Sequence, residues 1–365
     1  MKIRLPLLLI VCAFASSALA QSLFVPARYS NEVAVIDTST NQVVTQIPVG
    51  HFPIRIAMTL DRRKAFISDA HSTSISVLDT VAHANIATIP VSRVPGESTI
   101  TPDGRRLFVV HEAGLNHFNL QCPVDVIDTA TNLVITTVLI PGHWAKDILF
   151  TLDGRFAYIA NFFSGEVDVI DTTTYRVRRI PTAAGALRLC ISPAGDRVYV
   201  TNNHLAPGSV SVIDTATQQV IATVPVGQGP MGIAIRSDGR EVYTANSRGN
   251  TVSVIDTTTL SVIATIPTGG VWPSELVTTA DGTKCFVVNR NSDNVSVIDT
   301  ATGSVSTIIQ VGHRPFISRI SPDQTKLYVS DTRSTTVTVI NISSLTVAAT
   351  IANVGMQPFD MTFGP

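Results

Sequence analysis

A single sequence unit recurs eight times along this chain of 365 residues. Its clearest part is an apolar stretch that ends in Val-Ile-Asp-Thr or a close variant. The aspartate position of this motif falls at Asp37, Asp79, Asp128, Asp171, Asp214, Asp256, Asp299 and, with asparagine instead, Asn341. Successive copies lie 42, 49, 43, 43, 42, 43 and 42 residues apart. A period of this length that contains only short strand patterns predicts the blades of a β-propeller.

Each unit contains four short segments with the pattern of β-strands, which we name A to D in chain order. In the unit from 228 to 269, the segments 230–235, 241–245, 251–255 and 261–267 are rich in alternating apolar and β-branched residues. Asp238 and Gly239 supply turn chemistry between the first two segments. No segment shows a helical period of useful length. The sequence therefore predicts an all-β protein built from four-stranded antiparallel blades.

The two ends of the repeat array are out of phase with each other. The first unit starts at strand B with residues 22–26, and the last residues, 358–363, form a lone strand A. Together they complete one blade, which predicts an eight-bladed ring closed by the C-terminal strand, with no exposed terminal edge. We expect a single domain over 21–365, with blades at 21–50 plus 356–365, 51–92, 93–141, 142–184, 185–227, 228–269, 270–312 and 313–355.

The first 20 residues have the features of a signal peptide. A short basic start at 1–4 precedes an apolar stretch at 5–16, and Ala18-Leu19-Ala20 matches the small-residue cleavage pattern. The apolar stretch is shorter than the roughly 20 residues that a spanning helix needs. We therefore expect cleavage near Ala20 and a protein that works in the periplasm or at the cell surface.

Charge and cysteine content narrow the function classes. The formal net charge of −1 offers no general attraction to nucleic acid, which argues against that partner. Three cysteines follow the leader: Cys122, Cys190 and Cys285. Two of the three lie in apolar strand patterns. An odd number in such positions predicts buried free thiols rather than a disulfide framework.

Two further runs carry a family resemblance. Tyr199-Val-Thr-Asn202 and Phe286-Val-Val-Asn289, with the Val-Ser-Val-Ile-Asp-Thr and Ile-Pro-Val-Gly segments, resemble the YVTN-family β-propeller repeat. That family occurs in bacterial and archaeal exported and surface-layer proteins. The resemblance covers nearly all of 21–365 and implies the propeller fold, although many members are read as seven-bladed. It implies little about activity, because propellers carry many unrelated functions.

The most frequent polar residues are expected to be structural. An aspartate at the end of strand C can accept hydrogen bonds from the following backbone amides in an Asx-turn. The asparagines that close strand B are expected to hold the B–C loop in place: Asn161, Asn202, Asn246 and Asn289.

Function is expected where the eight copies differ. In a propeller the A strands line the central channel, and alternation should direct the second and fourth residues after an anchor such as Pro53 into it. The first, third and fifth, for example Ile54, Ile56 and Met58, should then pack between blades. The second position reads Arg55, Glu97, Asp147, Arg188, Gly232, Glu275, Ile317 and Asp360, and Arg319 falls at a fourth position. These charges are either a belt of ion pairs that fixes the register of the blades or the lining of a ligand-binding channel.

Histidines and tryptophans gather in the loops that should surround the channel mouth. The loop before strand A contains His51, His143 and His313, and both tryptophans of the chain, Trp144 and Trp272. They are either solvated loop residues or a cradle for a planar or sugar-like ligand or a metal.

The third blade has a longer B–C loop and an unusual set of polar residues. His111 replaces the usual asparagine, and Glu112 and His117 follow it. Histidine and carboxylate ligands suit zinc or copper, although the spacing matches no known ligand pattern.

No catalytic or cofactor motif is present. The sequence thus favours an exported, monomeric, non-catalytic binding or interaction module that needs no cofactor. Its ligand, a small molecule or an envelope protein, is expected at the channel mouth. The alternative is a periplasmic propeller enzyme or a cofactor or metal carrier, quinoprotein-like or haem d1-like. For that alternative, the tryptophan-rich docking repeat of quinoproteins is missing and no axial haem ligand aligns.

Overall fold

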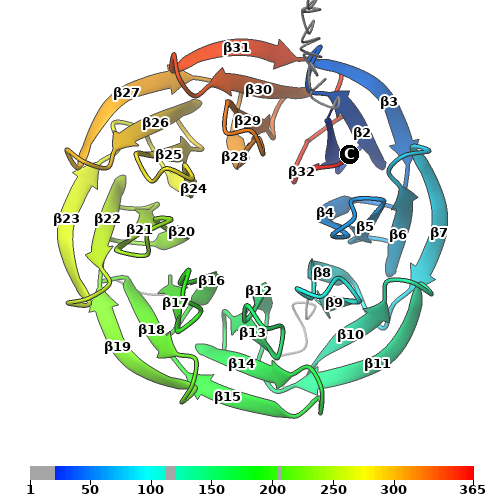
Figure 1. Cartoon of the computed structure of the whole chain (residues 1–365), viewed down its shortest axis with the longest axis horizontal. Helices are drawn as coiled ribbons and strands as arrows, with labels where there is room; N and C mark the ends of the chain where they lie inside the picture. Colours follow the sequence, from blue (N-terminus) through cyan, green and yellow to red (C-terminus); the bar gives the residue numbers. More distant parts are fainter. Residues whose placement is uncertain (1–20, 112–120, 204–206) are drawn as a thin grey trace, which may run out of the picture.

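The computed structural model describes residues 21–111, 121–203 and 207–365 and confirms the predicted eight-bladed β-propeller. Eight four-stranded antiparallel sheets surround a central axis, with strand A innermost and strand D outermost in each blade (Figure 1). We number the blades from the one that contains the N-terminal strand. Within the described ranges there is no helix long and apolar enough to span a bilayer.

The strands follow the repeat closely. The inner strands A are β32 (Thr362–Phe363), β4 (Pro53–Met58), β8 (Pro95–Ile100), β12 (Ala145–Phe150), β16 (Ala186–Ile191), β20 (Pro230–Ile235), β24 (Pro273–Thr278) and β28 (Pro315–Ile320). The B strands are β1 (Ser22–Ala27), β5 (Lys64–Asp69), β9 (Arg106–His111), β13 (Phe156–Asn161), β17 (Arg197–Asn202), β21 (Glu241–Asn246), β25 (Lys284–Asn289) and β29 (Lys326–Asp331).

The outer half of each blade is equally regular. The C strands are β2 (Glu32–Asp37), β6 (Ser74–Asp79), β10 (Cys122–Asp128), β14 (Glu166–Asp171), β18 (Ser209–Asp214), β22 (Thr251–Asp256), β26 (Asn294–Asp299) and β30 (Thr336–Asn341). The D strands are β3 (Gln42–Pro48), β7 (Ala84–Pro90), β11 (Leu133–Ile140), β15 (Val177–Pro181), β19 (Gln219–Pro225), β23 (Ser261–Pro267), β27 (Ser304–Gln310) and β31 (Thr346–Ile351).

The ring closes as the sequence predicts, through pairing of the chain ends. β32 pairs antiparallel with β1 through Phe363 opposite Leu23 and Thr362 opposite Phe24. This inner strand is shorter than the predicted 358–363, because Pro358 forms only an isolated bridge to Ala27. The backbone N–H of Phe359 donates to the carbonyl of Pro26 at 3.0 Å, which extends the seam beyond the regular pairing.

The hydrophobic core lies between neighbouring blades rather than at the centre of the ring. One cluster joins Phe24 and Val35 of blade 1 to Ile56 and Ile67 of blade 2, all of them buried. Comparable clusters occupy the other blade interfaces. The described cysteines carry free thiols, two of them buried, as predicted. Packing of this kind fixes each inner strand relative to the next one around the ring.

The repeated aspartates after strand C have the predicted structural role. Asp37 Oδ1 accepts a hydrogen bond from the backbone N–H of Ser39 at 2.7 Å. The same arrangement recurs around the ring, for example at Asp256, and Asn341 reproduces it with an amide oxygen in blade 8.

A buried polar residue closes strand B in seven of the eight blades. Asn246 Nδ2 donates across the B–C loop to Thr251 Oγ1 at 3.0 Å, as predicted, and also to Ser253 Oγ of strand C at 2.9 Å. Blade 2 has an aspartate at the same place, and Asp69 Oδ2 accepts from Ser76 Oγ at 2.8 Å. The preceding loop must make room for this side chain, since a Cβ on Gly50 would lie 2.5 Å from the Asp69 carboxyl.

Replacing Asp69 with asparagine should stabilise the protein at alkaline pH. Burial raises the pKa of Asp69 to about 7, against an ordinary value of about 3.9. The folded state thus holds this proton more tightly than the unfolded chain, and the resulting stability declines as the pH rises through 7. Asp69→Asn should raise the free energy of unfolding at pH 8 by about 2 kcal/mol and flatten its pH dependence between pH 4 and 7. Urea unfolding at pH 5 and pH 8 measures both quantities.

The reciprocal substitution in blade 6 provides the control. Asn246→Asp introduces the carboxyl into the same buried position opposite Ser253, so it should destabilise the protein more at pH 8 than at pH 5. Equal effects of either substitution at the two pH values would contradict the assignment.

Candidate functional site

The inner strands deviate from simple alternation at their first residues. In the seven inner strands from β4 to β28, the register with strand B shifts just after the anchor residue, for example between Pro53 and Arg55. Such a bulge adds a residue to one strand and changes which side chains face the channel. Ile54, Lys146 and Leu187, in the first position, therefore line the channel mouth together with the second position. Ile54 is buried and also lines this mouth, and Ile56 and Met58 pack in the interface of blades 1 and 2 as predicted.

All the charged residues predicted for the channel meet at one cavity. The cavity has a volume of about 300 Å³ and lies on the central axis below the mouth. Its lining includes Arg55, Glu97, Asp147, Arg188, Glu275, Arg319 and Asp360. Ile317 also lines it, as the second-position pattern predicts.

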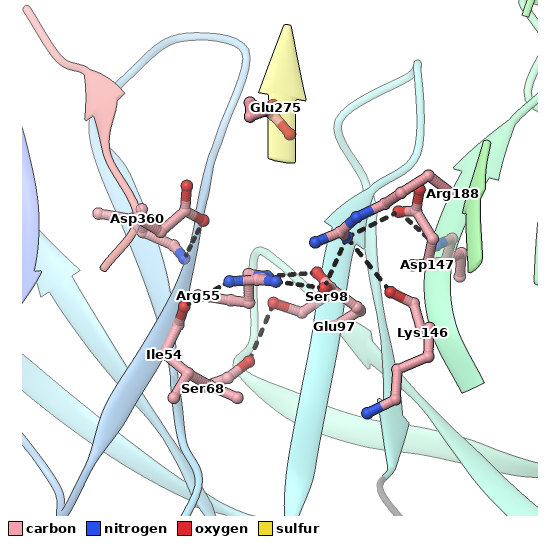
Figure 2. Close-up of polar contacts among 12 residues, drawn as sticks. Ile54, Arg55, Ser68, Glu97, Ser98, Lys146, Asp147, Arg188, Glu275 and Asp360 are labelled. Atoms are coloured by element: carbon pink, nitrogen blue, oxygen red, sulfur yellow. Dashed lines mark hydrogen bonds and ion pairs between the residues drawn. The ribbon is translucent and has the colours of Figure 1, made fainter. Parts of the chain in front are cut away.

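Glu97 bridges two arginines on one side of the channel. Arg55 holds it in a bidentate pair, Nε to Oε2 and Nη2 to Oε1, both at 2.5 Å (Figure 2). Arg188 Nη1 contacts the same Oε1 at 3.1 Å from the other side. Burial alone would raise the pKa of Glu97, but the two guanidinium groups outweigh it and lower this pKa to about 2.

Asp147 is held less tightly than Glu97. Its Oδ2 accepts the backbone N–H of Leu189 at 2.9 Å and its Oδ1 that of Ile148 at 3.0 Å, whereas Arg188 Nη1 lies 4.0 Å from Oδ1. Burial raises the pKa of Asp147 to about 6, with a further contribution from the negative charge of Glu97. Asp147 is therefore a carboxyl that changes protonation state close to neutral pH.

A second group of charges lies across the channel. Arg319 Nη2 contacts Asp360 Oδ1 at 3.1 Å, and its Nη1 lies 3.7 Å from Glu275 Oε1. Burial raises the pKa of Glu275. Figure 2 shows Glu275 facing the Arg55–Glu97–Arg188 group from the opposite wall. In the described part of the chain, blade 6 is the one blade that contributes no charged side chain to the lining of this cavity. Its second position is Gly232, where a Cβ would lie 2.9 Å from the backbone of Glu275.

The two tryptophans lie far apart rather than at one cradle. Trp144 stands before β12 and stacks on Phe163 at 4.3 Å, while Trp272 stands before β24, three blades further around the ring. Their φ angles of 60° and 62° are in the left-handed region that the same loop position adopts elsewhere with Gly185 and Gly229. The tryptophans therefore occupy a recurrent turn of the fold.

The predicted histidine ligands do not converge on a metal centre in the described residues. His313 Nδ1 pairs with Asp293 Oδ2 at 2.8 Å, and His51 and His143 belong to the loops of blades 2 and 4. No group of three or more histidine, cysteine, aspartate or glutamate side chains suited to a metal ion occurs in 21–111, 121–203 or 207–365. Glu112 and His117 lie outside the described residues.

His111 is a buried member of its blade and does not face the channel mouth. Its Nε2 contacts Asp125 Oδ2 at 2.9 Å and its Nδ1 contacts the carbonyl of Arg93 at 2.9 Å, so both ring nitrogens are engaged. It occupies the position that asparagine or aspartate fills in the neighbouring blades. Although burial opposes it, the hydrogen bonds from His111 and the Ser92 amide hold the pKa of Asp125 well below its usual range. His111 thus belongs to a His–Asp pair inside its blade, and its metal role together with Glu112 and His117 stays a prediction.

Aromatic residues at the mouth were not predicted from the sequence. Phe316 and Phe359 pack together with ring centroids 4.8 Å apart, and the Arg28 guanidinium lies 3.5 Å from the Phe359 centroid. Both phenylalanines occupy the first position after the anchor, the one that alternation assigned to the blade interfaces. An aromatic residue occurs at this position in these two copies of the repeat alone, and that difference was the signal in the sequence for an aromatic surface at the mouth.

Fold and site together define the protein as an eight-bladed β-propeller with a charged central channel. A family model described as "Lactonase, 7-bladed beta-propeller" matches residues 139–311. Two similar curated proteins are the uncharacterized protein YncE of Salmonella typhimurium, 30% identical over 129 residues, and the seven-bladed beta-propeller protein Rv1057 of Mycobacterium tuberculosis, 32% identical over 127 residues. These matches cover 34% and 33% of this chain and only 36% and 31% of the relatives. They support a β-propeller relationship, and the present chain differs in having eight blades.

Solved structures show the same architecture at low sequence identity. The dihydro-haem d1 dehydrogenase NirN, in complex with DHE, superposes with a TM-score of 0.77 at 14% identity, covering 93% of this chain and 74% of NirN. Hydrazine synthase of Kuenenia stuttgartiensis gives 0.61 at 23% identity, covering 77% and 92%. A functionally unknown protein of Desulfotomaculum acetoxidans gives 0.60 at 18%, covering 94% and 99%. At these identities the likeness concerns the fold alone.

Removing the charge of Glu97 should weaken the fold in a pH-dependent way. Glu97→Gln leaves two largely buried guanidinium groups, of Arg55 and Arg188, without their shared carboxylate. We expect a loss of about 2 kcal/mol in the free energy of unfolding at pH 7, between the values for exposed and fully buried pairs. Because the pKa of Glu97 is lowered on folding, this stabilisation is present above about pH 4.3 and is lost as the pH falls towards 2.

Chemical unfolding at pH 7, 5 and 3 tests this expectation. The variant should lose less stability on acidification than the unmodified protein. Asp299→Asn is the control, since Asn341 already fills the equivalent turn of blade 8, and it should leave the unfolding midpoint unchanged. A Glu97→Gln variant as stable as the control would show that the pairs make no net contribution.

Proposed function

We propose that this protein is a binding module that holds a small polar ligand in its central channel. One observation carries the proposal: seven of the eight blades each contribute a charged side chain to the same cavity of about 300 Å³. That volume is at the lower end of the range of about 300–1,000 Å³ for small-molecule pockets. The candidate site lies on the side of blades 2 to 5, where Arg55, Glu97, Asp147 and Arg188 meet.

The pairing within the cavity is incomplete, which favours a ligand over a purely structural belt. Charges that serve only to fix blade register are expected to be fully paired and hydrogen-bonded. Glu97 meets this requirement, whereas Asp147 and Glu275 lie 4.0 and 3.7 Å from their guanidinium neighbours. Burial raises the pKa of both carboxyl groups, to about 6 for Asp147, so the Asp147 carboxyl can donate as well as accept a hydrogen bond at about pH 6. Such groups suit the hydroxyl groups of a polar ligand.

The cellular location is part of the proposal. The leader-like residues 1–20 and the resemblance to exported YVTN-type repeat proteins support a periplasmic or cell-surface protein. We further propose that it acts as a monomer, on a small molecule or an envelope protein, without a required cofactor.

An enzymatic role is the second candidate, and the family model is the observation that favours it. The lactonase-described match over 139–311 includes three of the channel charges, Asp147, Arg188 and Glu275. The haem d1-like or quinoprotein-like version has less support, because His111 is engaged inside its blade. Turnover of a lactone that is abolished by Asp147→Asn would replace the binding proposal with an enzymatic one. Colour or stoichiometric metal in natively purified protein would favour a carrier.

A thermal-shift screen of sugars, lactones, metals and quinone cofactors tests the proposal directly. A ligand that binds only the folded state raises the melting temperature in proportion to RT ln(1 + [L]/Kd). We expect a polyhydroxylated ligand to stabilise the unmodified protein and to lose at least about tenfold in affinity with Arg188→Gln, which removes a charged hydrogen-bond donor from the cavity.

The control for this screen is Arg248→Gln, which removes an arginine from an exposed loop of blade 6. Its affinity should match that of the unmodified protein. The same ligand shift in the Arg188 variant as in the control would reject the channel as the binding site and leave the charges as a structural belt.

A further inference from the structure

The net charge of −1 conceals a strongly uneven distribution of charge. The described loops that precede strand A and that join strands B and C contain six arginines: Arg28, Arg93, Arg248, Arg290, Arg314 and Arg333. The same described loops contain only two acidic residues, Asp293 and Asp360, and Asp360 lines the channel cavity and pairs with Arg319 there. The repeated aspartates of the Asp-Gly and Asp-Thr turns lie at the opposite ends of the strands. The channel mouth is therefore a basic face of a nearly neutral protein.

Three of these arginines form a cluster over blades 7 and 8. Arg290 directly follows β25, and its guanidinium lies 5.1 Å from the ring centroid of Phe316 in the next blade. Arg314 precedes that phenylalanine by two residues. The loop of Arg333 is bonded to the loop of Arg314, since the backbone N–H of Thr332 donates to the Arg314 carbonyl at 3.1 Å. We call Arg290, Arg314 and Arg333 the blade 7–8 arginine cluster.

The cluster has no carboxylate partner among the residues that the structure describes. Arg290 Nε is buried and has no hydrogen-bond acceptor there. Asp293, the acid of this loop, uses Oδ1 for the backbone N–H of Arg314 and Oδ2 for His313 Nδ1, both at 2.8 Å. Burial and the positive charges of Arg314 and Arg333 lower the pKa of Arg290. Like charges held this close gain stability from a bound anion.

An aromatic surface connects the cluster to the channel. Phe316 packs on Phe359 at 4.8 Å with an interplanar angle of 33°, and Phe359 lines the mouth cavity of about 200 Å³. The Arg55 guanidinium lies 5.0 Å from the same ring. A ligand bound at the cluster would therefore have an apolar surface that leads to the charged belt.

We propose that the blade 7–8 arginine cluster binds the carboxylate or phosphate group of a ligand whose planar, apolar part lies on Phe316 and Phe359. Guanidinium groups match both oxyanions with paired N–H donors. The inference deepens the proposed function and rests on it, because it assigns an anionic group to the ligand that enters the channel mouth. Arg290, Arg314 and Arg333 supply positively charged guanidinium groups, and the phenylalanines supply the stacking surface.

Isothermal titration with phenyl phosphate, benzoate and inorganic phosphate at low ionic strength tests the subsite. Phenyl phosphate should bind more tightly than inorganic phosphate, and comparison with benzoate shows which oxyanion the cluster prefers. Arg290→Gln should weaken phenyl phosphate binding about tenfold or more, since a charged, bidentate donor is lost. Arg290→Lys should restore only part of the loss. Phe316→Ala should weaken phenyl phosphate but leave inorganic phosphate unchanged.

Arg248→Gln, on the same face but in blade 6, is the matched control and should retain the affinity within about twofold, because only a distant exposed charge is removed. Absence of saturable binding by phenyl phosphate and benzoate would overturn the inference. So would equal weakening by Arg290→Gln and Arg248→Gln, which would indicate a diffuse field instead of a site.

Failure of this inference is distinguishable from failure of the proposed function. Arg188→Gln should weaken binding of the ligand found in the thermal-shift screen by at least about tenfold, while phenyl phosphate still binds. Anion binding that depends on Arg290 in a protein without any channel ligand would keep the subsite and reject the channel proposal. A ligand that binds in the channel, without anion binding that depends on Arg290, would keep the channel proposal and reject the subsite.

Discussion

Closure of the ring is the constraint on which the channel depends. The seam between β32 and β1 places the last segment of the chain beside blade 2. Asp360 then reaches Arg319 of blade 8 at 3.1 Å and the backbone N–H of Ile56 in blade 2 at 3.4 Å. The residue that completes the first blade thus connects the second blade to the eighth through the channel. Without the closed seam, the charged side chains would have no common axis to face.

Packing between blades then decides what the channel can contain. The B and C strands are buried and alike in every copy, so they hold the inner strands at nearly equal spacing around the axis. Because strands B and C impose that spacing, the residues of strand A that face the channel are free to differ between copies. Blade 6 is the exception: its Gly232 lets β24 approach so closely that a Cβ would meet the Glu275 backbone. Divergence in the channel therefore costs the fold little, except where neighbouring inner strands touch.

The sequence was sufficient for the architecture and for the deep channel, and insufficient for the mouth. Eight copies of one period, with ends that complement each other, predicted the ring and its seam. Alternation correctly directed Arg55, Glu97 and Arg188 into the channel. It did not anticipate that Ile54 and its equivalents also line the mouth, because a bulge at the start of the inner strands is invisible in a pattern of apolar and polar residues.

Local context also misled the interpretation of single residues. His111 read as an available ligand because its neighbours in sequence are polar, yet its position in the repeat is a buried one that needs two hydrogen-bond partners. The arginine cluster escaped notice because an overall charge of −1 averages over two faces of opposite character. Only the topology shows that loops 42 residues apart along the chain share one face.

The two cavities of the channel share one boundary, and that geometry links the belt to the mouth. Arg55, Glu97 and Arg188 line both the mouth cavity and the deeper one. Arg55 also lies against Phe359, so the aromatic surface at the mouth and the ion pairs below it have a side chain in common. A ligand that enters from the basic face meets these paired arginines before it reaches Asp147 and Glu275. Structural and binding roles of the belt are therefore compatible, because the well-paired glutamate separates the cavities while the loosely paired carboxyl groups lie beyond it.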